Sequence, residues 1–151
     1  SREGYEPELF KSVISINKKQ PRRLINLAEK KFGSLKNKNV CCLGLSFKPG
    51  TDDVRESQAI KVVKILTEEL PSKVIVHDPK AMENAKRVLG NSVKYAHTAS
   101  ECVAKAKIVF LLVPWDEYKD ATLYTNKKVV DGWGVLKNLI NLEKTKYISL
   151  V

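Results

Sequence analysis

The stretch Val40-Cys41-Cys42-Leu43-Gly44-Leu45 is a short apolar run, and it decides the class of fold that the chain can adopt. A run of this length without polar alternation is typical of a strand that is covered on both faces of a sheet. A loop rich in glycine and proline follows it, and then apolar residues recur at helical spacing, at Ile60, Val63, Leu66 and Leu70. A buried strand that leads into a helix favours β-α-β units and therefore a parallel sheet.

The same alternation continues to the end of the chain. Further strands are predicted at Lys73–His77, Val93–Tyr95, Lys107–Val113, Lys128–Val130 and Tyr147–Val151, with helices at Ala81–Leu89 and Ser100–Ala106. We therefore expect an α/β fold, a Rossmann-like doubly wound parallel sheet of about six strands.

The first 33 residues show helical spacing, which Pro21 ends or kinks and which Gly33 closes. We expect a helical arm over residues 1–36 and one α/β domain over residues 37–151. The 151 residues are enough for one hydrophobic core but are few for two full domains.

Positive charge is concentrated in the arm. The net charge is +10, and residues 1–40 hold ten lysines and arginines against four glutamates. Such asymmetry suits a nucleic-acid-binding module, and it equally suits the solvated face of a lysine-rich helix. Because no reading motif or interleaving of aromatic and basic residues accompanies it, we expect the solvated face and no nucleic-acid partner.

The longest uncharged apolar run, Ile108–Trp115, is far shorter than the roughly 20 residues of a membrane span. No apolar stretch of the kind found in a signal peptide follows Ser1. We expect a cytoplasmic protein without a membrane partner.

The three cysteines, Cys41, Cys42 and Cys102, are odd in number, and no C-x-x-C or histidine pair accompanies them. This excludes a disulfide scaffold and a structural zinc site. We expect reduced thiols that pack as small apolar groups, two inside the first strand and Cys102 on a surface-type helix.

The loop after the first strand occupies the position where open α/β sheets bind ligands. It matches neither G-x-G-x-x-G nor the P-loop. Asp53 and Glu56 have the spacing of a capping box, and Asp52 with Glu56 can orient Arg55. Lys48 places a positive charge beside the Phe47 ring, which suits a nucleotide. From residue types alone, a purely structural role is equally consistent, in which the charged residues only stabilise the start of the helix.

At this point the sequence resembles a known family. The run Gly44-Leu45-Ser46-Phe47-Lys48-Pro49-Gly50-Thr51-Asp52-Asp53-Val54-Arg55-Glu56-Ser57 is similar to the signature of UDP-glucose 6-dehydrogenases. Three further stretches resemble the family in order and spacing, namely Asn17-Lys18-Lys19-Gln20, His77-Asp78-Pro79-Lys80-Ala81 and Val113-Pro114-Trp115-Asp116-Glu117-Tyr118.

The resemblance implies that residues 1–36 are the end of a central linker helix and residues 37–151 a C-terminal UDP-binding domain. The family's enzymes oxidise UDP-glucose to UDP-glucuronate with two NAD⁺, through a covalent intermediate on a cysteine. NAD would be bound mainly by an N-terminal domain outside this sequence, which would also hold the nucleophile. The chain alone is therefore expected to be inactive, and the family implies a homodimer around the central helix.

The resemblance also implies roles for single residues. Phe47 and Lys48 match positions that contact the UDP-sugar, and Arg55 matches a position that reaches NAD. We expect Asp52, Asp53, Glu56 and Ser57 to place that lysine and arginine, and we expect no catalytic residue within the chain.

One position departs from the family pattern. In Val130-Asp131-Gly132-Trp133-Gly134, tryptophan stands where the family usually has an arginine that binds the UDP-sugar. An indole stacks but cannot clamp a phosphate. The alternative substrate is another UDP-hexose, such as a UDP-N-acetylhexosamine.

A further alternative is a free-standing NAD-binding domain, with Asp78 as its ribose-binding acid. The missing glycine fingerprint argues against it.

Overall fold

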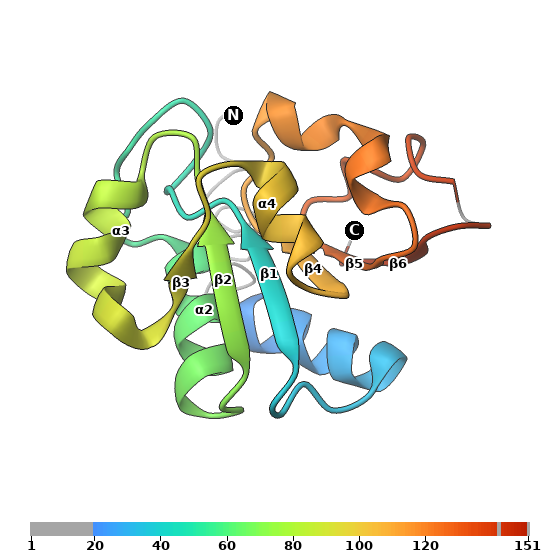
Figure 1. The fold of residues 1–151 in the computed structure, drawn as a ribbon, viewed down its shortest axis with the longest axis horizontal. Coiled ribbons are helices and arrows are strands. Elements are labelled where there is room, and N and C mark those ends of the chain that lie inside the picture. Colours follow the sequence, from blue (N-terminus) through green and yellow to red (C-terminus); the bar gives the residue numbers. More distant parts are fainter. Residues whose placement is uncertain (1–19, 142, 151) are drawn as a thin grey trace, which may run out of the picture.

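The computed structural model describes residues 20–141 and 143–150 of the chain (Figure 1). Its centre is a six-stranded sheet in the order β3-β2-β1-β4-β5-β6, and every neighbouring pair is parallel. The predicted doubly wound sheet of about six strands is confirmed. The strands are β1 (Asn39–Leu43), β2 (Lys73–His77), β3 (Lys94–Tyr95), β4 (Ile108–Leu111), β5 (Lys128–Asp131) and β6 (Lys146–Ser149).

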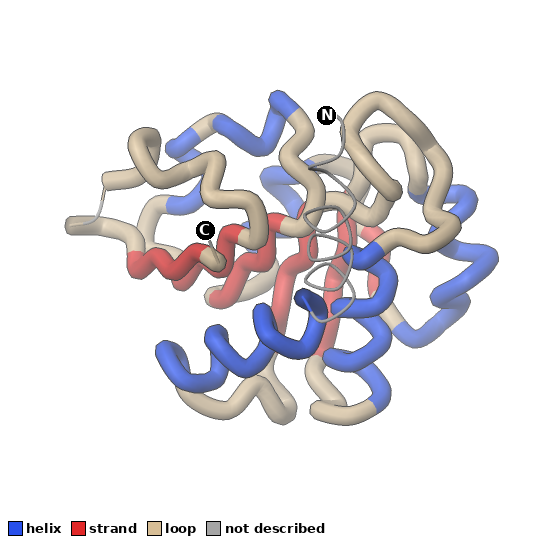
Figure 2. The backbone as a smooth tube through the Cα atoms, turned by 180° about the vertical axis from the view of Figure 1, so that it is seen from behind, coloured by secondary structure: helices blue, strands red, loops and turns tan. Residues whose placement is uncertain are grey.

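Helices cover both faces of this sheet (Figures 1 and 2). One face carries a helix over residues 20–32 together with α2 (Gln58–Glu68) and α3 (Met82–Leu89). The other carries α4 (Ala99–Ala104) and the short 3₁₀ turns η2 (Asp116–Lys119) and η3 (Ala121–Tyr124), while η1 (Gly90–Ser92) follows α3 directly.

Strand β1 shows how the sequence builds the two halves of the core. Because successive side chains of a strand point to opposite faces, Val40 and Cys42 join the cluster under α2, whereas Cys41 and Leu43 join the cluster under α4. All four are fully buried. The continuous apolar run is thus explained by a central strand that is covered on both sides.

The helix over residues 20–32 belongs to the same core as the sheet. Its residues Leu24, Ile25 and Ala28 are buried in the cluster that contains Phe110 of β4 and Val130 of β5. Gly33 ends this helix with φ +91°, and its N–H donates to the carbonyl of Glu29 at 2.9 Å, as expected of a helix-ending glycine.

The helix predicted over residues 1–19, including the Asn17-Lys18-Lys19 part of its motif, lies outside the described residues, and the division at residues 36 and 37 stays a prediction. Within 20–141 and 143–150, no helix is long and apolar enough to cross a membrane.

Candidate functional site

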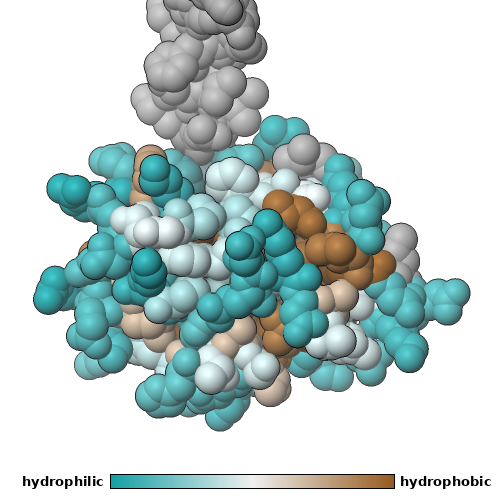
Figure 3. All heavy atoms as spheres, turned by 90° about the horizontal axis from the view of Figure 1, so that it is seen from above, coloured by the Kyte–Doolittle hydropathy of each residue, from teal (hydrophilic) through white to brown (hydrophobic). Residues whose placement is uncertain are grey.

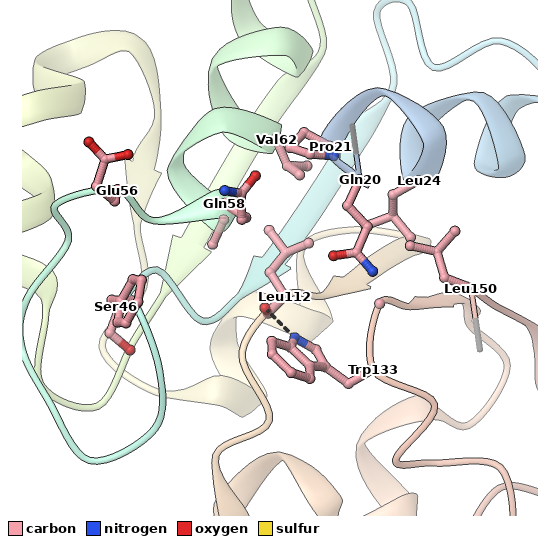
Figure 4. A pocket seen from close by; sticks show the side chains of 13 residues that line it. Gln20, Pro21, Leu24, Ser46, Glu56, Gln58, Val62, Leu112, Trp133 and Leu150 are labelled. Atoms are coloured by element: carbon pink, nitrogen blue, oxygen red, sulfur yellow. Dashed lines mark hydrogen bonds between the residues drawn. The ribbon is translucent and has the colours of Figure 1, made fainter. Parts of the chain in front are cut away.

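A pocket of about 190 Å³ opens beside the carboxyl ends of β1, β4 and β5 (Figure 4). Its wall includes Ser46 and Phe47 after β1, Leu112 after β4, and Gly132 and Trp133 after β5. Strand order reverses between β1 and β4, and open α/β sheets bind their ligands at this switch point. The structure therefore has a pocket at the edge of the sheet where the sequence predicts the binding site.

Two helices complete the wall of the pocket. Gln58 and Ala59 stand in the first turn of α2, and Gln20 stands in the first described turn of the helix over residues 20–32. Figure 4 shows both glutamine side chains reaching towards the same space, with the Trp133 ring below them. Figure 3 looks down on this edge of the sheet, where polar side chains cover most of the face and apolar ones gather at one side.

Two exposed aromatic side chains line the pocket. Phe47 is 53% exposed and Trp133 is 51% exposed, although both are large apolar groups. The indole N–H of Trp133 donates to the carbonyl oxygen of Leu112 at 2.8 Å, so the ring is held in one orientation. Half-exposed rings at the rim of a pocket offer stacking surfaces to a flat ligand.

Asp131 fixes the loop that carries Trp133. Its Oδ1 accepts hydrogen bonds from the backbone N–H groups of Trp133 and Gly134, both at 2.9 Å. Its Oδ2 accepts the backbone N–H of Leu136 at 2.8 Å and the hydroxyl of Tyr147 at 2.7 Å. Asp131 is fully buried, and burial together with its carboxylate raises the pKa of Tyr147.

Asp78 fixes the loop after β1 in the same way. Its Oδ2 accepts the backbone N–H groups of Leu45 and Ser46 at 2.7 and 3.0 Å, and its Oδ1 accepts those of Lys80 and Ala81 at 2.9 and 2.8 Å. Because the carboxylate is buried and engaged inside the protein, it is not placed to bind a ribose. This argues against a free-standing NAD-binding domain that uses Asp78.

The start of α2 differs from the capping box that the sequence predicts. The N-cap is Ser57, whose Oγ accepts the backbone N–H of Ile60 at 3.3 Å and donates to the carbonyl of Leu45 at 2.8 Å. The prediction that Asp53 caps the helix is wrong, because the chain between Asp53 and Ser57 forms a separate turn. Ser57 is buried and ties the helix start to the end of β1.

The exposed part of the loop holds a bidentate ion pair. The Nε and Nη2 of Arg55 donate to the two carboxylate oxygens of Asp53 at 3.0 and 2.9 Å, which lowers the pKa of Asp53 to about 2. The expectation that Asp52 and Glu56 orient Arg55 is wrong, since the partner is Asp53. Glu56 adopts φ +57°, an unusual conformation for a residue with a side chain.

The predicted site residues divide into two groups. Phe47 and Glu56 line the pocket, and Ser57 joins the start of α2 to the carbonyl of Leu45 beside it. Lys48, Asp52 and Arg55 are exposed on the same loop but do not line the pocket, and Asp53 is half-buried there.

The sequence reasoning missed Gln20 and Gln58. Within the part of the chain that the structure describes, Gln58 Oε1 is the one buried side-chain oxygen or nitrogen without a hydrogen-bond partner. A glutamine directly after the loop motif, followed by the apolar pair Ala59 and Ile60, was the signal that could have identified it.

The thiols are buried as predicted, but Cys102 is fully buried too, so its assignment to a surface-type helix is wrong. Burial raises the pKa of Cys41 and Cys42 well above the usual range of a thiol. A nucleophilic cysteine requires an accessible thiolate, and these two thiols do not fit that role.

This fold and this pocket define a class of protein, an open α/β domain with a pocket at the switch point of the sheet, where such sheets bind their ligands. Residues 41–138 match the family model of the UDP-glucose/GDP-mannose dehydrogenase family, UDP-binding domain, and the chain belongs to this family. The resemblance seen in the loop motif is thereby confirmed.

Similar proteins include UDP-glucose 6-dehydrogenase AglM of Haloferax volcanii, 37% identical over 153 residues, which cover 99% of this chain and 34% of AglM. UDP-glucose 6-dehydrogenase YwqF of Bacillus subtilis is 38% identical over 116 residues, 77% of this chain and 26% of YwqF. The solved structure of a UDP-glucose dehydrogenase from Pyrobaculum islandicum has a TM-score of 0.81 at 38% identity, covering 91% of this chain and 31% of that one. The chain thus spans between about a quarter and a third of the length of these relatives.

Proposed function

We propose that this chain is the C-terminal UDP-sugar-binding domain of an NAD-dependent UDP-glucose 6-dehydrogenase, which converts UDP-glucose, two NAD⁺ and water to UDP-glucuronate. The observation that carries the proposal is the pocket at the switch point, walled by Phe47 and Trp133. The similar proteins AglM and YwqF are named as UDP-glucose 6-dehydrogenases, which supports the choice of UDP-glucose.

The pocket suits the parts of a UDP-sugar. A uracil ring would stack against Phe47 or Trp133, because every nucleobase offers an aromatic face. The first turn of α2 lines the pocket, and the N–H groups of a helix N-terminus favour a nearby phosphate. Lys48 stands next to Phe47 on the loop after β1. It would add the positive charge that Trp133, unlike an arginine, cannot supply.

NAD would be held mainly by another part of the protein. Arg55 is exposed and is oriented by Asp53, so it is free on its outer side to reach an anionic cofactor. The described residues offer no glycine fingerprint for a dinucleotide, and the carboxylate of Asp78 is already engaged. We assign to this chain the binding of the UDP-sugar and a supporting contact to NAD, within a homodimer formed through residues 1–36.

Isothermal titration with UDP-glucose, UDP-glucuronate, a UDP-N-acetylhexosamine and NAD⁺, each alone, tests the proposal. We expect both UDP-glucose and UDP-glucuronate to bind, and Phe47→Ala or Trp133→Ala to weaken the binding of each by roughly 5- to 150-fold, since a stacked base is worth about 1–3 kcal/mol. Val88→Ala is the matched control, because Val88 is 45% exposed on α3 and does not line the pocket.

Tight binding of NAD⁺ without binding of any UDP-sugar would overturn the proposal. Preference for the UDP-N-acetylhexosamine would keep the domain and change the substrate. Salt-dependent binding of an oligonucleotide, with no response to UDP-sugars, would instead establish the nucleic-acid-binding module. Light scattering of the whole protein tests the homodimer.

A further inference from the structure

Two of the three cysteines face one another in the core. Cys41 lies in the central strand β1 and Cys102 lies in α4, 61 positions further along the chain, and their Sγ atoms are 2.6 Å apart. Both residues are fully buried. The mechanism proposed above uses neither of them.

The separation is too short for ordinary packing. Two carbon atoms in contact lie about 3.5–4.0 Å apart, and sulfur is larger than carbon. Both residues are free thiols in this structure, and their sulfur atoms are in direct contact; a disulfide would bring them to roughly 2.05 Å.

The helix α4 holds Cys102 over the sheet. Thr98 caps α4 by accepting the backbone N–H of Glu101 at 3.0 Å, and α4 packs on β1 and β2. The Sγ of Cys102 also lies 3.5 Å from the carbonyl oxygen of Ile75 in β2. The encounter of the two sulfur atoms is therefore fixed by the fold and does not depend on a mobile loop.

We propose that Cys41 and Cys102 form an internal disulfide bond that links β1 to α4. Cys42 stays a thiol, because it points to the opposite face of the sheet and joins the other half of the core. A single bridge of this kind is compatible with a chain whose cysteine pattern excludes a disulfide scaffold, and it departs from the expectation that all three cysteines stay reduced.

The bond forms by exchange with a small-molecule disulfide. The thiolate of one cysteine attacks the small disulfide and releases one small thiol, and the second protein thiolate then attacks the mixed disulfide and releases the other. The protein loses two hydrogens and the small disulfide becomes two thiols. Burial keeps the pKa of Cys41 high and shields both sulfur atoms, so we place the exchange during folding, before α4 closes over β1.

Peptide mapping tests the bond directly. The protein is refolded with oxidised glutathione, alkylated under denaturing conditions without reductant, and digested with trypsin. We expect one linked pair, residues 39–55 joined to residues 95–105, with a single alkylated cysteine in the first peptide. Reduction before alkylation should release both peptides and label all three cysteines.

Variants identify the partner of Cys102. Cys42→Ala should keep the linked pair, whereas Cys41→Ala and Cys102→Ala should each abolish it. Wild type should unfold at a temperature higher by roughly 10 °C in the oxidised than in the reduced form, because the bond closes a long loop. Cys42→Ala should keep this difference, and Cys102→Ala should lose it.

Three alkylated cysteines after oxidative refolding, or a linked pair that survives Cys41→Ala and disappears in Cys42→Ala, would overturn the proposal. The mapping of the wild type needs no variant, so it decides the question even where a substitution prevents folding. Failure of the UDP-sugar titration would leave this result untouched, since the two experiments share no residue.

Discussion

Asp131 shows how much one side chain contributes to the site. Three backbone N–H groups and the hydroxyl of Tyr147 depend on its carboxylate, in a place that water does not reach. We expect Asp131→Ala to lower the free energy of unfolding by about 3 kcal/mol or more, because it leaves these donors unsatisfied. Urea denaturation measures the change.

Asp116→Ala is the matched control for this prediction. The Asp116 side chain is 99% exposed and forms only a surface ion pair with Lys119, so its removal should leave the urea midpoint within error. Equal midpoints for Asp131→Ala and Asp116→Ala would show that the carboxylate of Asp131 does not hold the loop.

His77 makes the stability of the domain depend on pH. It is buried at the end of β2, its Nδ1 lies 2.8 Å from the hydroxyl oxygen of Tyr118, and burial lowers its pKa. Below about pH 6.5 the unfolded chain therefore binds a proton more readily than the native protein, so stability falls as the pH drops below that value. Above that pH His77 is neutral in both states and adds no slope.

Unfolding in urea at a series of pH values between 5 and 8 measures this slope. His77→Tyr, which replaces the imidazole with a side chain that stays neutral between pH 5 and 8, should reduce the loss of stability towards pH 5. His97→Gln is the control, since His97 is exposed and is the only other histidine of the chain. An unchanged slope in His77→Tyr would contradict the assignment.

At the scale of the elements, the ends of β1 and β4 approach so closely that only a glycine fits between them. A Cβ atom on Gly44 would lie 2.5 Å from Cβ and 2.7 Å from the backbone nitrogen of Val113, and Gly44 has φ +98°. Gly44→Ala should therefore lower the free energy of unfolding by at least about 3 kcal/mol or prevent folding.

Gly50→Ala separates the two causes, crowding and backbone conformation. Gly50 has φ +91° but nothing lies within 4 Å of its added Cβ, so only the conformational cost of about 1–2 kcal/mol remains. Urea denaturation of both variants checks the difference, and equal losses would show that contact with Val113 is not the constraint.

The elements were largely predictable, because their signals are local. The run around β1 and the alternation of strands and helices predict the sheet and its parallel direction. The start of α2 was not predictable from spacing, since both Asp53 and Ser57 are residue types that cap helices. The choice depends on the hydrogen bond from Ser57 to Leu45, which forms only once β1 is in place.

The pocket was predictable in part, for a similar reason. The topology of an open α/β sheet indicates the loop with Phe47, and the family resemblance draws attention to Trp133. Gln20 and Gln58 join them because the first described turn of the helix over residues 20–32 and the start of α2 lie at the same edge of the sheet, which no local pattern encodes. The sequence pattern placed Cys102 on a surface-type helix, but α4 has only six residues. Half of them are buried, and Cys102 is one of these.

At the scale of the whole molecule, the chain is one core with a basic surface. The helix over residues 20–32 adds its apolar side to that core, whereas Arg22 and Arg23 face the solvent. Arg22 forms an exposed ion pair with Glu69 of the α2 C-cap, at 2.6 Å. Within residues 20–32, this arrangement fits the expectation that the basic residues belong to a solvated helix face.

The 151-residue chain should not oxidise UDP-glucose on its own, because its described residues offer neither an accessible thiolate nor a dinucleotide site. Formation of NADH, followed by its absorbance with UDP-glucose and NAD⁺ present, should stay at the level without protein. A dehydrogenase of the relatives' full length, such as AglM, serves as the positive control. Turnover by this chain would refute the assignment of the nucleophile to another part of the protein.

The hydrogen bonds of Asp131 have a consequence for how this family can change its ligand. The carboxylate holds the loop through main-chain N–H groups, so the loop keeps its shape whichever side chain stands at position 133. Selection can therefore exchange an arginine for a tryptophan at the rim of the pocket without rebuilding the protein around it. Side chains of the loop can change while its backbone conformation stays the same. New preferences among nucleotide sugars can therefore evolve there one substitution at a time.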